Sequence, residues 1–351
     1  MYLELDGSYG EGGGQILRSS LSMAALLNKP IRIHNIRAGR KKPGLQAQHL
    51  TCVTAAAAIS GADVEGAEVN SQKLAFKPRA LQSGNFQFDV SDVYASAGSM
   101  PLIFQTLLPS LCFANSRSQI SLFGGTHVPW SPPFHYIDLV FLPIVRAMGV
   151  KANVKLLKAG WYPRGGGNIA AEIEPGERLK PIDLREAGKL ERIYCVSGSS
   201  NLPAHIAQRQ ADHAAAILKS AGFKPEVEIL QLSSPGQGTI VFILAEFENS
   251  RAGFTELGAI GKKAEKVAQE CCAKFLEFMR MQAGCAIECH LGDQLIIYMA
   301  LAQGRSCFTT ASISQHLLTN IWVVEQFLPV KFQLKGQLGE PGEVCVEGID
   351  R

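Results

Sequence analysis

Residues 3–27 read LELDGSYGEGGGQILRSSLSMAALL, and this stretch shows the unit from which the chain is built. A short apolar strand runs into a glycine-rich turn, and the residues after the turn have the apolar spacing of a helix. Further along, the pattern predicts a strand at 31–36, a helix at 45–60 and strands at 63–69 and 73–78. The predicted order of elements in this first pass is therefore βαβαββ.

The same order of elements returns twice. Residues 86–175 predict a strand, a helix, a strand, a helix and two strands, and residues 285–348 predict the same series, beginning with a strand at 285–290. Sequence identity between the passes is slight, so we infer the repeat from the order of elements and from the glycine or aspartate with glutamine at helix starts. The sequence thus predicts an α/β (α+β) fold of three βαβαββ repeats.

Residues 185–279 have a different order of predicted elements. Its pattern predicts a strand, a long helix, two strands and a second helix, which is a βαββα series. The flanking segments contain proline, glycine and charged residues, as domain boundaries often do. We therefore expect residues 185–279 to be an inserted domain, and residues 1–184 and 280–351 to form the domain of three repeats.

The composition describes a globular protein with a sizeable core, since 46% of the residues are hydrophobic. The net charge of +3 is small, so any argument for nucleic-acid binding must rest on local basic clusters. Nine cysteines at irregular positions predict a reducing compartment rather than a disulfide framework. We find neither a leader sequence nor a membrane-spanning run, and expect a soluble cytoplasmic protein, or a nuclear one in a eukaryotic host.

One histidine stands at the start of a predicted amphipathic helix. His316 lies in SQHLLTN, where Ser314 is the expected N-cap. Helix N-terminal amides favour an anion and disfavour imidazolium, so a neutral histidine there could attack phosphorus. A lone histidine in such a helix is more often a packed or capping residue. Residues 307–328 by themselves therefore favour the packed or capping role.

The glycine-rich turn offers a carboxylate and a guanidinium beside exposed backbone. Glu11 precedes three glycines and Arg18 follows them, an arrangement suited to phosphate or to a metal–nucleotide complex. The turn is neither a dinucleotide fingerprint, because Gln15 replaces the last glycine, nor a P-loop, because the lysine is missing. A tight turn with Glu11 at the surface explains the pattern equally well.

A basic loop follows the second strand. Residues 37–44 read RAGRKKPG, and Gln48 and His49 lie in the helix behind them. Arginine binds phosphate through two parallel hydrogen bonds, and polar side chains orient sugar hydroxyls. A solvated loop would explain the two lysines better than it explains Arg37 and Arg40.

Residues 123–138, FGGTHVPWSPPFHYID, form a loop rich in proline and aromatic residues between a strand and a helix. Trp130 and Phe134 could wall a base or ribose site, although such loops are as often plain connections. His127 and His135 are expected to be structural.

The segment ECHLGDQ, residues 288–294, begins the first helix of the third pass. Asp293 and Gln294 could cap that helix or contact a metal or a ribose. Tyr298 could stack on an adenine, although tyrosine at such a position more often belongs to the core. The nearby cysteines lack a second ligand pair at metal-binding spacing, so we do not expect structural zinc.

Taken together, six motifs occur in the order and approximate spacing of the RNA 3′-terminal phosphate cyclase family, which the chain resembles from Asp6 to about Val346. The motifs are DGSYGEGGGQILRSSL, RAGRKKPGLQAQHL, FGGTHVPWSPPFHY, YPRGGG, HLGDQ and SQHLLTN. The resemblance implies three βαβαββ repeats about a pseudo-threefold axis, an arrangement similar to that of enolpyruvyl transferases, with a small inserted α/β domain.

The resemblance also implies a reaction. The family uses ATP to convert an RNA 3′-phosphate into a 2′,3′-cyclic phosphodiester, through a histidinyl-AMP and an RNA–pp–A intermediate, and releases AMP and pyrophosphate. The histidine of SQHLLTN, His316, matches the nucleophile, and Glu11 is assigned to a Mg²⁺ or Mn²⁺ ion. The implied ATP contacts are Gln105, His290, Leu291, Gly292, Asp293, Gln294 and Tyr298. The implied contacts with substrate phosphates and the RNA end are Arg18, Arg37, Arg40, Gln48 and His49.

Two other functions share this architecture. A non-catalytic cyclase-like branch acts in ribosome assembly, but its members lack the nucleophilic histidine that is present here as His316. An enolpyruvyl transferase would act on a small molecule and would need no adenylylated histidine. Lysine-based nucleotidyl transfer is disfavoured because no K-x-D-G motif occurs. We therefore expect an RNA cyclase of unknown oligomeric state.

Overall fold

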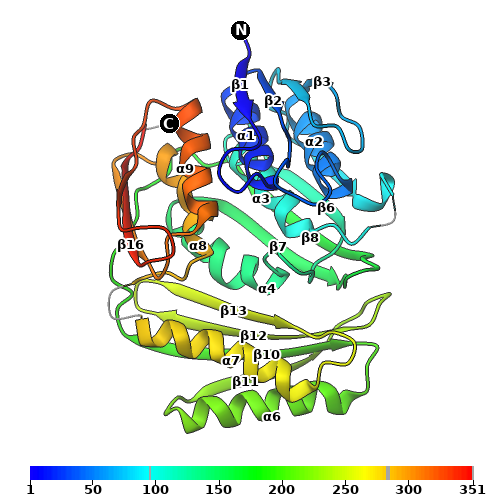
Figure 1. Ribbon diagram of the computed structural model, residues 1–351, viewed down its shortest axis with the longest axis vertical. Coiled ribbons are helices and arrows are strands. Elements are labelled where there is room, and N and C mark those ends of the chain that lie inside the picture. The colour runs from blue at the N-terminus through cyan, green and yellow to red at the C-terminus, as the bar shows by residue number, and fades with distance from the viewer. Residues whose placement is uncertain (95, 282–284, 350–351) are drawn as a thin grey trace.

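The first repeat folds into a four-stranded sheet with two helices on one face (Figure 1). Its elements are β1 (Leu3–Asp6), α1 (Gly14–Leu27), β2 (Ile31–His34), α2 (Ala47–Ser60), β3 (Asp63–Glu65) and β4 (Leu74–Lys77). Ile31 and Ile33 in β2 are buried toward the helices, whereas Arg32 between them points to solvent. The computed structural model describes residues 1–94, 96–281 and 285–349.

The second repeat has the same sheet topology. Its elements are β5 (Asn85–Asp89), η1 (Val90–Asp92), α3 (Met100–Leu111), β6 (Ser118–Gly124), α4 (Phe134–Tyr136), η2 (Ile137–Phe141), α5 (Leu142–Ala147), β7 (Lys151–Lys158) and β8 (Gly167–Glu174). The strand order is β5-β6-β8-β7, which matches β1-β2-β4-β3. In both sheets the first pair of strands is parallel and the other two pairs are antiparallel.

The third repeat also has this topology, but its first strand comes from an unexpected place. Its elements are β9 (Asp183–Leu184), α8 (Leu291–Leu301), β14 (Arg305–Thr310), α9 (Gln315–Phe327), β15 (Gln333–Lys335) and β16 (Gly342–Glu347). The predicted strand at 285–290 is wrong, since Ile287 makes just an isolated bridge to Thr310. The parallel neighbour of β14 is β9, which precedes the inserted segment. The predicted fold of three repeats is otherwise confirmed.

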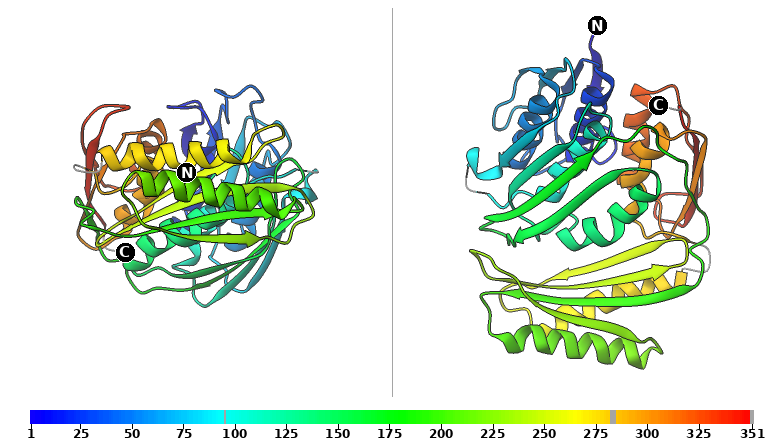
Figure 2. Two further views of the ribbon diagram at one scale, coloured as in Figure 1. Left: turned by 90° about the horizontal axis from the view of Figure 1, so that it is seen from below. Right: turned by 180° about the vertical axis from the view of Figure 1, so that it is seen from behind.

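Residues between β9 and α8 form a fourth sheet. Its elements are β10 (Leu190–Ser200), α6 (Ala204–Ser220), β11 (Pro225–Gln231), β12 (Gly238–Phe247), β13 (Arg251–Leu257) and α7 (Ala264–Met281). The series is βαβββα, so the predicted βαββα series was wrong in omitting β13, which pairs with β12 directly after a tight turn. Helices α6 and α7 cover one face of this sheet (Figure 2). Its other side meets the second repeat, where Gly253 lies against Val140 and Tyr136.

The helices of the three repeats pack together between their sheets. Helix α1 contacts α2, α3 and α9, and α8 contacts α9. Their facing side chains are apolar and buried, among them Leu21 and Phe104, and removing such surface from water is the main force that holds the repeats together. As a result the start of α9, far along the chain, lies beside the turn before α1.

One disulfide joins Cys307 in β14 to Cys345 in β16. The two residues are directly opposite each other in the antiparallel register, a closeness that their irregular spacing in the sequence hides. The irregular spacing predicted no disulfide framework and gave no sign of this single pair, whereas the other seven cysteines are free. Within the described residues, no helix combines the length and the apolar character needed to cross a membrane.

Candidate active site

Helix α9 presents His316 in its first turn. The Oγ atom of Ser314 accepts a hydrogen bond from the backbone N–H of Leu317 at 3.1 Å, so Ser314 is the N-cap, as predicted. One turn along, the buried side chain of Asn320 donates to the backbone carbonyl of Asp293 in α8. Helix α9 is therefore held at its start and against its neighbour, which gives His316 a defined position.

The glycine-rich turn packs directly on α9. The ring of Tyr9 stacks on Trp322 with 4.1 Å between centroids. Gly10 has a φ of +60°, and a Cβ atom there would lie 2.4 Å from Oγ1 of Thr319. Glycine is required at this position for both reasons, the left-handed backbone and the close approach. The turn thus delivers Glu11 to the end of α9 that carries His316.

Glu11 lies between His316 and Arg40. Its Oε1 is 3.2 Å from Nδ1 of His316, without the alignment of a hydrogen bond, and its Oε2 accepts from Nη2 of Arg40 at 2.7 Å. Burial would raise the pKa of the Glu11 carboxyl, but His316, Arg40 and Arg18 outweigh burial and the pKa lies below its usual value. Glu11 is therefore a carboxylate at neutral pH, and it faces the predicted nucleophile.

Arg18 is a cation without a carboxylate partner. Its Nη2 donates to Oε1 of Gln15 at 2.7 Å, and among the described residues no carboxylate lies within ion-pairing distance. Burial lowers the pKa of its guanidinium. A Cβ atom on Gly14 would lie 2.7 Å from Nη1 of Arg18 and 2.8 Å from Nε2 of His49, so this glycine leaves room for both side chains. An anionic ligand would supply the missing countercharge.

His49 is buried next to the arginines and is neutral. Its Nδ1 faces the backbone N–H of Gln46 at 3.3 Å and accepts from it. Burial, and then the charges of Arg37, Arg18 and Arg40, hold the pKa of His49 well below its usual value. The three arginines therefore share one positive region with a histidine that cannot add to their charge.

Arg37 and Gln48 also bond to the protein's own backbone. Nη1 of Arg37 donates to the carbonyls of Lys42 and Gly44 at 2.8 and 2.7 Å, which folds the basic loop back on itself. Oε1 of Gln48 accepts from the backbone N–H of Ser99 at 2.7 Å, where α3 begins. Both residues thus shape the site, whatever contact they make with a substrate.

The HLGDQ segment brings a second polar group to the start of α8. Nε2 of Gln105 donates to Oε1 of Gln294 at 2.5 Å, and Nε2 of Gln294 donates to the carbonyl of His290 at 2.6 Å. Burial raises the pKa of Asp293 to about 6, although the charges of His316 and His290 oppose the rise. Residues predicted as ATP contacts from two different repeats therefore lie within one hydrogen-bonded group.

Sequence reasoning missed Glu288, whose side chain holds the backbone of the HLGDQ segment in place. Its side chain is 4% exposed, accepts a short hydrogen bond from the hydroxyl of Tyr136, and accepts from the backbone N–H of His290 at 2.7 Å. The neighbouring side chains of Cys289 and Glu288 raise the pKa of His290 to about 10. Tyr136 belongs to another repeat, and nothing in the local sequence around Glu288 indicates that contact.

Comparison with known proteins agrees with the motifs. A family model described as RNA 3′-terminal phosphate cyclase matches residues 9–334. The chain belongs to the RNA 3′-terminal phosphate cyclase family. A relative of that name from Pyrobaculum neutrophilum is 44% identical over 352 residues, which cover 99% of each chain. Another from Nostoc punctiforme is 46% identical over 328 residues, 93% of this chain and 94% of its own. The solved enolpyruvyl transferase NikO from Streptomyces tendae aligns with all of this chain and 82% of its own at 12% identity, but the TM-score of 0.23 is too low to bear on the fold.

Three of the residues assigned from the cyclase resemblance are buried within α8. Tyr298 is 2% exposed and its ring meets the edge of Phe141, so its face is not available to an adenine and the predicted stacking is not supported. Leu291 and Gly292 are buried as well, with Gly292 against the ring of Phe308. These residues set the path of the backbone rather than offer side chains to a ligand.

The aromatic loop of this cyclase chain divides into a buried and an exposed part. Phe134 is buried, and His127 and His135 form a buried pair with Nε2 of His127 3.1 Å from Nδ1 of His135. Burial lowers the pKa of His135 to about 4, and its ring packs on Phe242 of the fourth sheet. The two histidines hold the second repeat to that sheet, in line with the structural role expected of them. Trp130, in contrast, is exposed.

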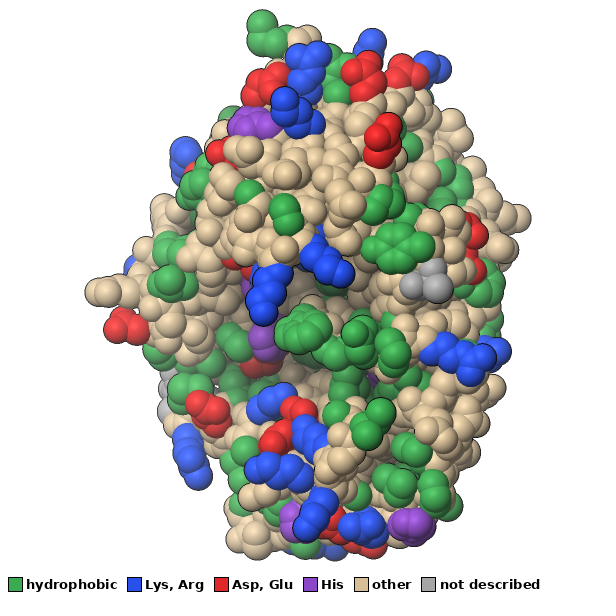
Figure 3. Space-filling model, turned by 45° about the vertical axis from the view of Figure 1, so that its right-hand side comes forward, with side chains coloured by type: hydrophobic (Ala, Val, Ile, Leu, Met, Phe, Trp, Pro, Cys, Tyr) green, Lys and Arg blue, Asp and Glu red, His purple; other side chains and the backbone are tan. Residues whose placement is uncertain are grey.

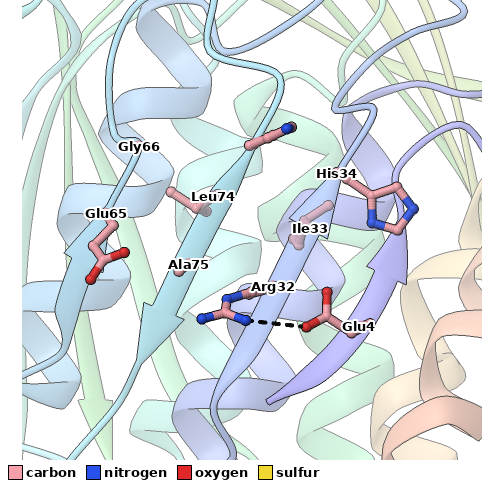
Figure 4. Close-up of a pocket in the computed structure, with 9 residues that line it drawn as sticks. Glu4, Arg32, Ile33, His34, Glu65, Gly66, Leu74 and Ala75 are labelled. Atoms are coloured by element: carbon pink, nitrogen blue, oxygen red, sulfur yellow. Dashed lines mark ion pairs between the residues drawn. The ribbon is translucent and has the colours of Figure 1, made fainter.

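Two hollows of the surface differ in position and in the side chains that line them. Figure 3 shows a recess between the three repeats and the fourth sheet, with basic side chains on its upper edge and hydrophobic side chains in front of it. Figure 4 shows a groove on the outer face of the first sheet, where Glu4 and Arg32 lie 3.7 Å apart beside His34 and Glu65. The groove faces away from α1 and α2 and contains none of the predicted site residues.

Proposed function

We propose that this chain uses ATP to convert the 3′-phosphate end of RNA into a 2′,3′-cyclic phosphodiester, with His316 as the residue that carries AMP. The contact of 3.2 Å between His316 and Glu11, beside arginines that lack enough countercharge, carries this proposal. Family membership supports the reaction, since the relatives described above are named RNA 3′-terminal phosphate cyclases.

Glu11 would give His316 the tautomer that nucleophilic attack requires. A small rotation of the ring would align the Nδ1–H group with Oε1 of Glu11, and hydrogen bonds of this kind often tighten when the substrate binds. Nε2 would then keep its lone pair, and the carboxylate would stabilise the positive charge that develops on the ring during attack. The lowered pKa of Glu11 keeps that carboxylate ionised.

The reaction would take three steps. His316 attacks the α-phosphorus of ATP, a P–N bond forms and pyrophosphate leaves. A terminal oxygen of the RNA 3′-phosphate then attacks the adenylate, which breaks the P–N bond and leaves RNA–pp–A. Finally the neighbouring 2′-hydroxyl attacks the 3′-phosphorus and AMP departs. Because the last step is intramolecular, positioning supplies much of its rate.

The arginines would bind the phosphates in these steps. Arg18 and Arg40 point at the turn that precedes α1, where they can neutralise the α-phosphate and the RNA 3′-phosphate. Arg37, Gln48 and His49 lie behind them and would position the RNA end. A neutral His49 can donate or accept a hydrogen bond there without adding to the charge.

ATP would lie between α3 and the start of α8. Gln105 and Gln294 already bond to each other and would present amide groups to the nucleotide, while Asp293 offers a carboxylate to the ribose. His290 is exposed and protonated at neutral pH, which suits it to a phosphate. Leu291, Gly292 and Tyr298 would act through the backbone and the core.

A divalent cation, Mg²⁺ or Mn²⁺, fits at Glu11. Oε1 of Glu11 is buried and receives no hydrogen bond within the described part of the chain, and hard cations take such oxygens together with phosphate oxygens and water. When bound, the cation would offset the negative charge of the ATP phosphates.

We assign this chemistry to residues 1–184 and 280–351, because every residue named in it lies there. Residues 185–279, which include the fourth sheet, would be an inserted domain outside the reaction itself.

The proposal can be tested by labelling. Incubation with ATP carrying ³²P at the α-phosphate, together with Mg²⁺ or Mn²⁺, should label the protein through a bond that is labile to acid and stable to alkali. His316→Ala should take no label, while His213→Ala, which removes a histidine from α6 of the fourth sheet, should be labelled as the parent is. Equal labelling of His316→Ala would refute the mechanism. Absence of label in the parent chain would favour a non-catalytic role.

A further inference from the structure

Trp130 occupies a conformation that a protein rarely gives to its largest side chain. It is 97% exposed and its backbone has a φ of +60°. Exposing a large apolar side chain forgoes the stabilisation that burial brings, and a bulky residue with positive φ is an outlier. The exposed indole and the positive φ both cost stability, and two such costs at one residue point to a function.

The loop that carries Trp130 is anchored at both ends to the candidate active site. At its first end the backbone N–H of Met100 donates to the carbonyl of Gly125 at 2.9 Å, next to the Ser99 N–H that Gln48 holds. At its other end Tyr136 donates to Glu288, beneath the HLGDQ segment. The loop therefore spans the two segments that hold the substrate phosphates and the nucleotide in the proposed reaction.

The loop is also rigid without a ligand. Pro129, Pro132 and Pro133 fix φ on both sides of Trp130, and the backbone N–H of Phe134 closes the base of the loop on the carbonyl of Thr126 at 3.0 Å. Little conformational entropy would be lost when a ligand contacts the indole ring. Trp130 is thus a preformed surface.

A second exposed aromatic side chain lies on the segment that pairs with this loop. His127 forms a parallel bridge with Trp161, and the next residue, Tyr162, is 64% exposed. We call Trp130 and Tyr162 the aromatic platform. Hydrophobic side chains gather in front of the recess in Figure 3, below the basic side chains on its upper edge.

We propose that the aromatic platform binds the nucleobases of single-stranded RNA just upstream of the 3′-terminal nucleotide, with Trp130 as the stacking residue. Every base has a π face, so stacking on an exposed indole holds a strand without reading its sequence. This inference rests on the proposed function. If the terminal phosphate of the RNA binds the arginines, the rest of the strand must leave the site on the side that is open to solvent.

RNA suits this surface better than ATP. The groups proposed to contact ATP, Gln105 and Gln294, are half-buried and bonded to each other, whereas Trp130 is open to solvent.

Steady-state cyclisation by the full chain tests the inference with two substrates. One is a decaribonucleotide with a 3′-phosphate, and the other is the same strand without bases at the three positions before the last nucleotide. Trp130→Ala should raise KM for the complete strand about tenfold, which is about 1.4 kcal/mol of lost stacking, and leave KM for the abasic strand unchanged. Trp130→Phe should restore most of the affinity. Ile260→Ala, which removes another fully exposed apolar side chain from the loop between β13 and α7, serves as the control.

Three results would overturn the inference. The first is an unchanged KM for the complete strand in Trp130→Ala, and the second is an equal rise for the abasic strand. The third is a loss of labelling by ATP, which would assign Trp130 to the nucleotide.

If the parent chain is labelled by ATP but cyclises neither strand, the proposed function fails, and binding alone still decides the inference. Trp161 is buried, and a Trp322→Phe background removes the remaining indole, which stacks on Tyr9 of the glycine-rich turn. In that background, quenching of fluorescence on RNA addition that disappears in Trp130→Ala would support stacking, and quenching that persists would refute it.

Discussion

Nδ1 of His316 lies 3.2 Å from Oε1 of Glu11, although the two residues stand at opposite ends of the chain. The same carboxylate accepts a hydrogen bond from Arg40. One side chain thus connects the glycine-rich turn, the basic loop and the start of α9, and it does so because α1 packs against α9.

Glu11→Gln should slow the formation of the labelled intermediate about 10–100-fold, the usual cost of losing the group that orients a catalytic histidine. The amide keeps the shape of the side chain but no longer stabilises positive charge on the ring. Single-turnover labelling with ATP measures the rate. Glu4→Gln on the outer face of the first sheet removes a similar charge away from the site and should have no effect. A normal rate in Glu11→Gln would contradict this role for Glu11.

Arg18→Met should stabilise the free protein and weaken its response to ligand. An apolar side chain removes a half-buried cation that lacks a carboxylate partner, a gain of about 1 kcal/mol or more. The same change removes a phosphate contact, so the rise in melting temperature on adding ATP should shrink. Thermal unfolding with and without ATP measures both effects. Arg32→Met, on the exposed face of β2, is the control. A full ATP-dependent rise in Arg18→Met would show that Arg18 does not touch the nucleotide.

Tyr136→Phe should destabilise the fold and raise KM for ATP together. It leaves an oxygen of the buried Glu288 without its donor, which costs about 1–3 kcal/mol, and it loosens the backbone at His290. We expect KM for ATP to rise several-fold while kcat changes little, because Glu288 positions the segment and does not touch the reacting atoms. Tyr94→Phe, which removes a hydroxyl from an exposed tyrosine bonded to the N–H of Ala47, is the comparison. A lower kcat with unchanged KM would argue against a positioning role.

The pH dependence should report Asp293. Burial raises its pKa to about 6, so its carboxylate is lost as the pH falls through 6, and labelling should decline there if the ionised form contacts ATP. Asp293→Asn should be slow at every pH and should lack this decline. The charges of His316, His290, Glu288 and Arg18 also act on Asp293. Persistence of the decline in the variant would show that a group other than Asp293 causes it.

The same shift predicts an effect on stability with a definite sign. The folded chain holds the Asp293 proton more tightly than the unfolded chain, whose carboxyl has a pKa of 3.8. Ionisation therefore costs stability as the pH rises from about 4 to above 6. Asp293→Asn should raise the melting temperature at pH 8 and have little effect near pH 3.5. A stabilisation that is the same at both pH values would exclude this cause.

Removing the disulfide should lower stability without touching the site. Cys307 and Cys345 are separated by 38 residues, and closing a loop of that size contributes about 2–4 kcal/mol to the free energy of unfolding. Cys345→Ser should lower the melting temperature and make it insensitive to reductant. Cys112→Ser, at a buried free cysteine, should leave the sensitivity to reductant intact. Nine reactive thiols in the unfolded, unreduced parent chain would show that the bond does not form.

Much of the fold followed from patterns a few residues long. Alternating apolar residues and glycine turns predicted the repeated βαβαββ order, and the spacing after Ser314 predicted helix α9 with its cap. The same local patterns failed for β9 and the segment at 285–290, because strand pairing depends on a distant partner. A strand of two residues such as β9 carries no periodic signal.

By itself the sequence determined the repeated units, the order of the motifs and the identity of His316 as a candidate, since these depend on composition and spacing along the chain. The tertiary structure decided which groups meet: Glu11 with His316, Gln105 with Gln294, Tyr136 with Glu288, and Cys307 with Cys345. It also placed Tyr298 in the core and left Trp130 in solvent. The physical reason is that burial and contact between distant residues are set by the packing of whole helices and sheets, which no local pattern encodes.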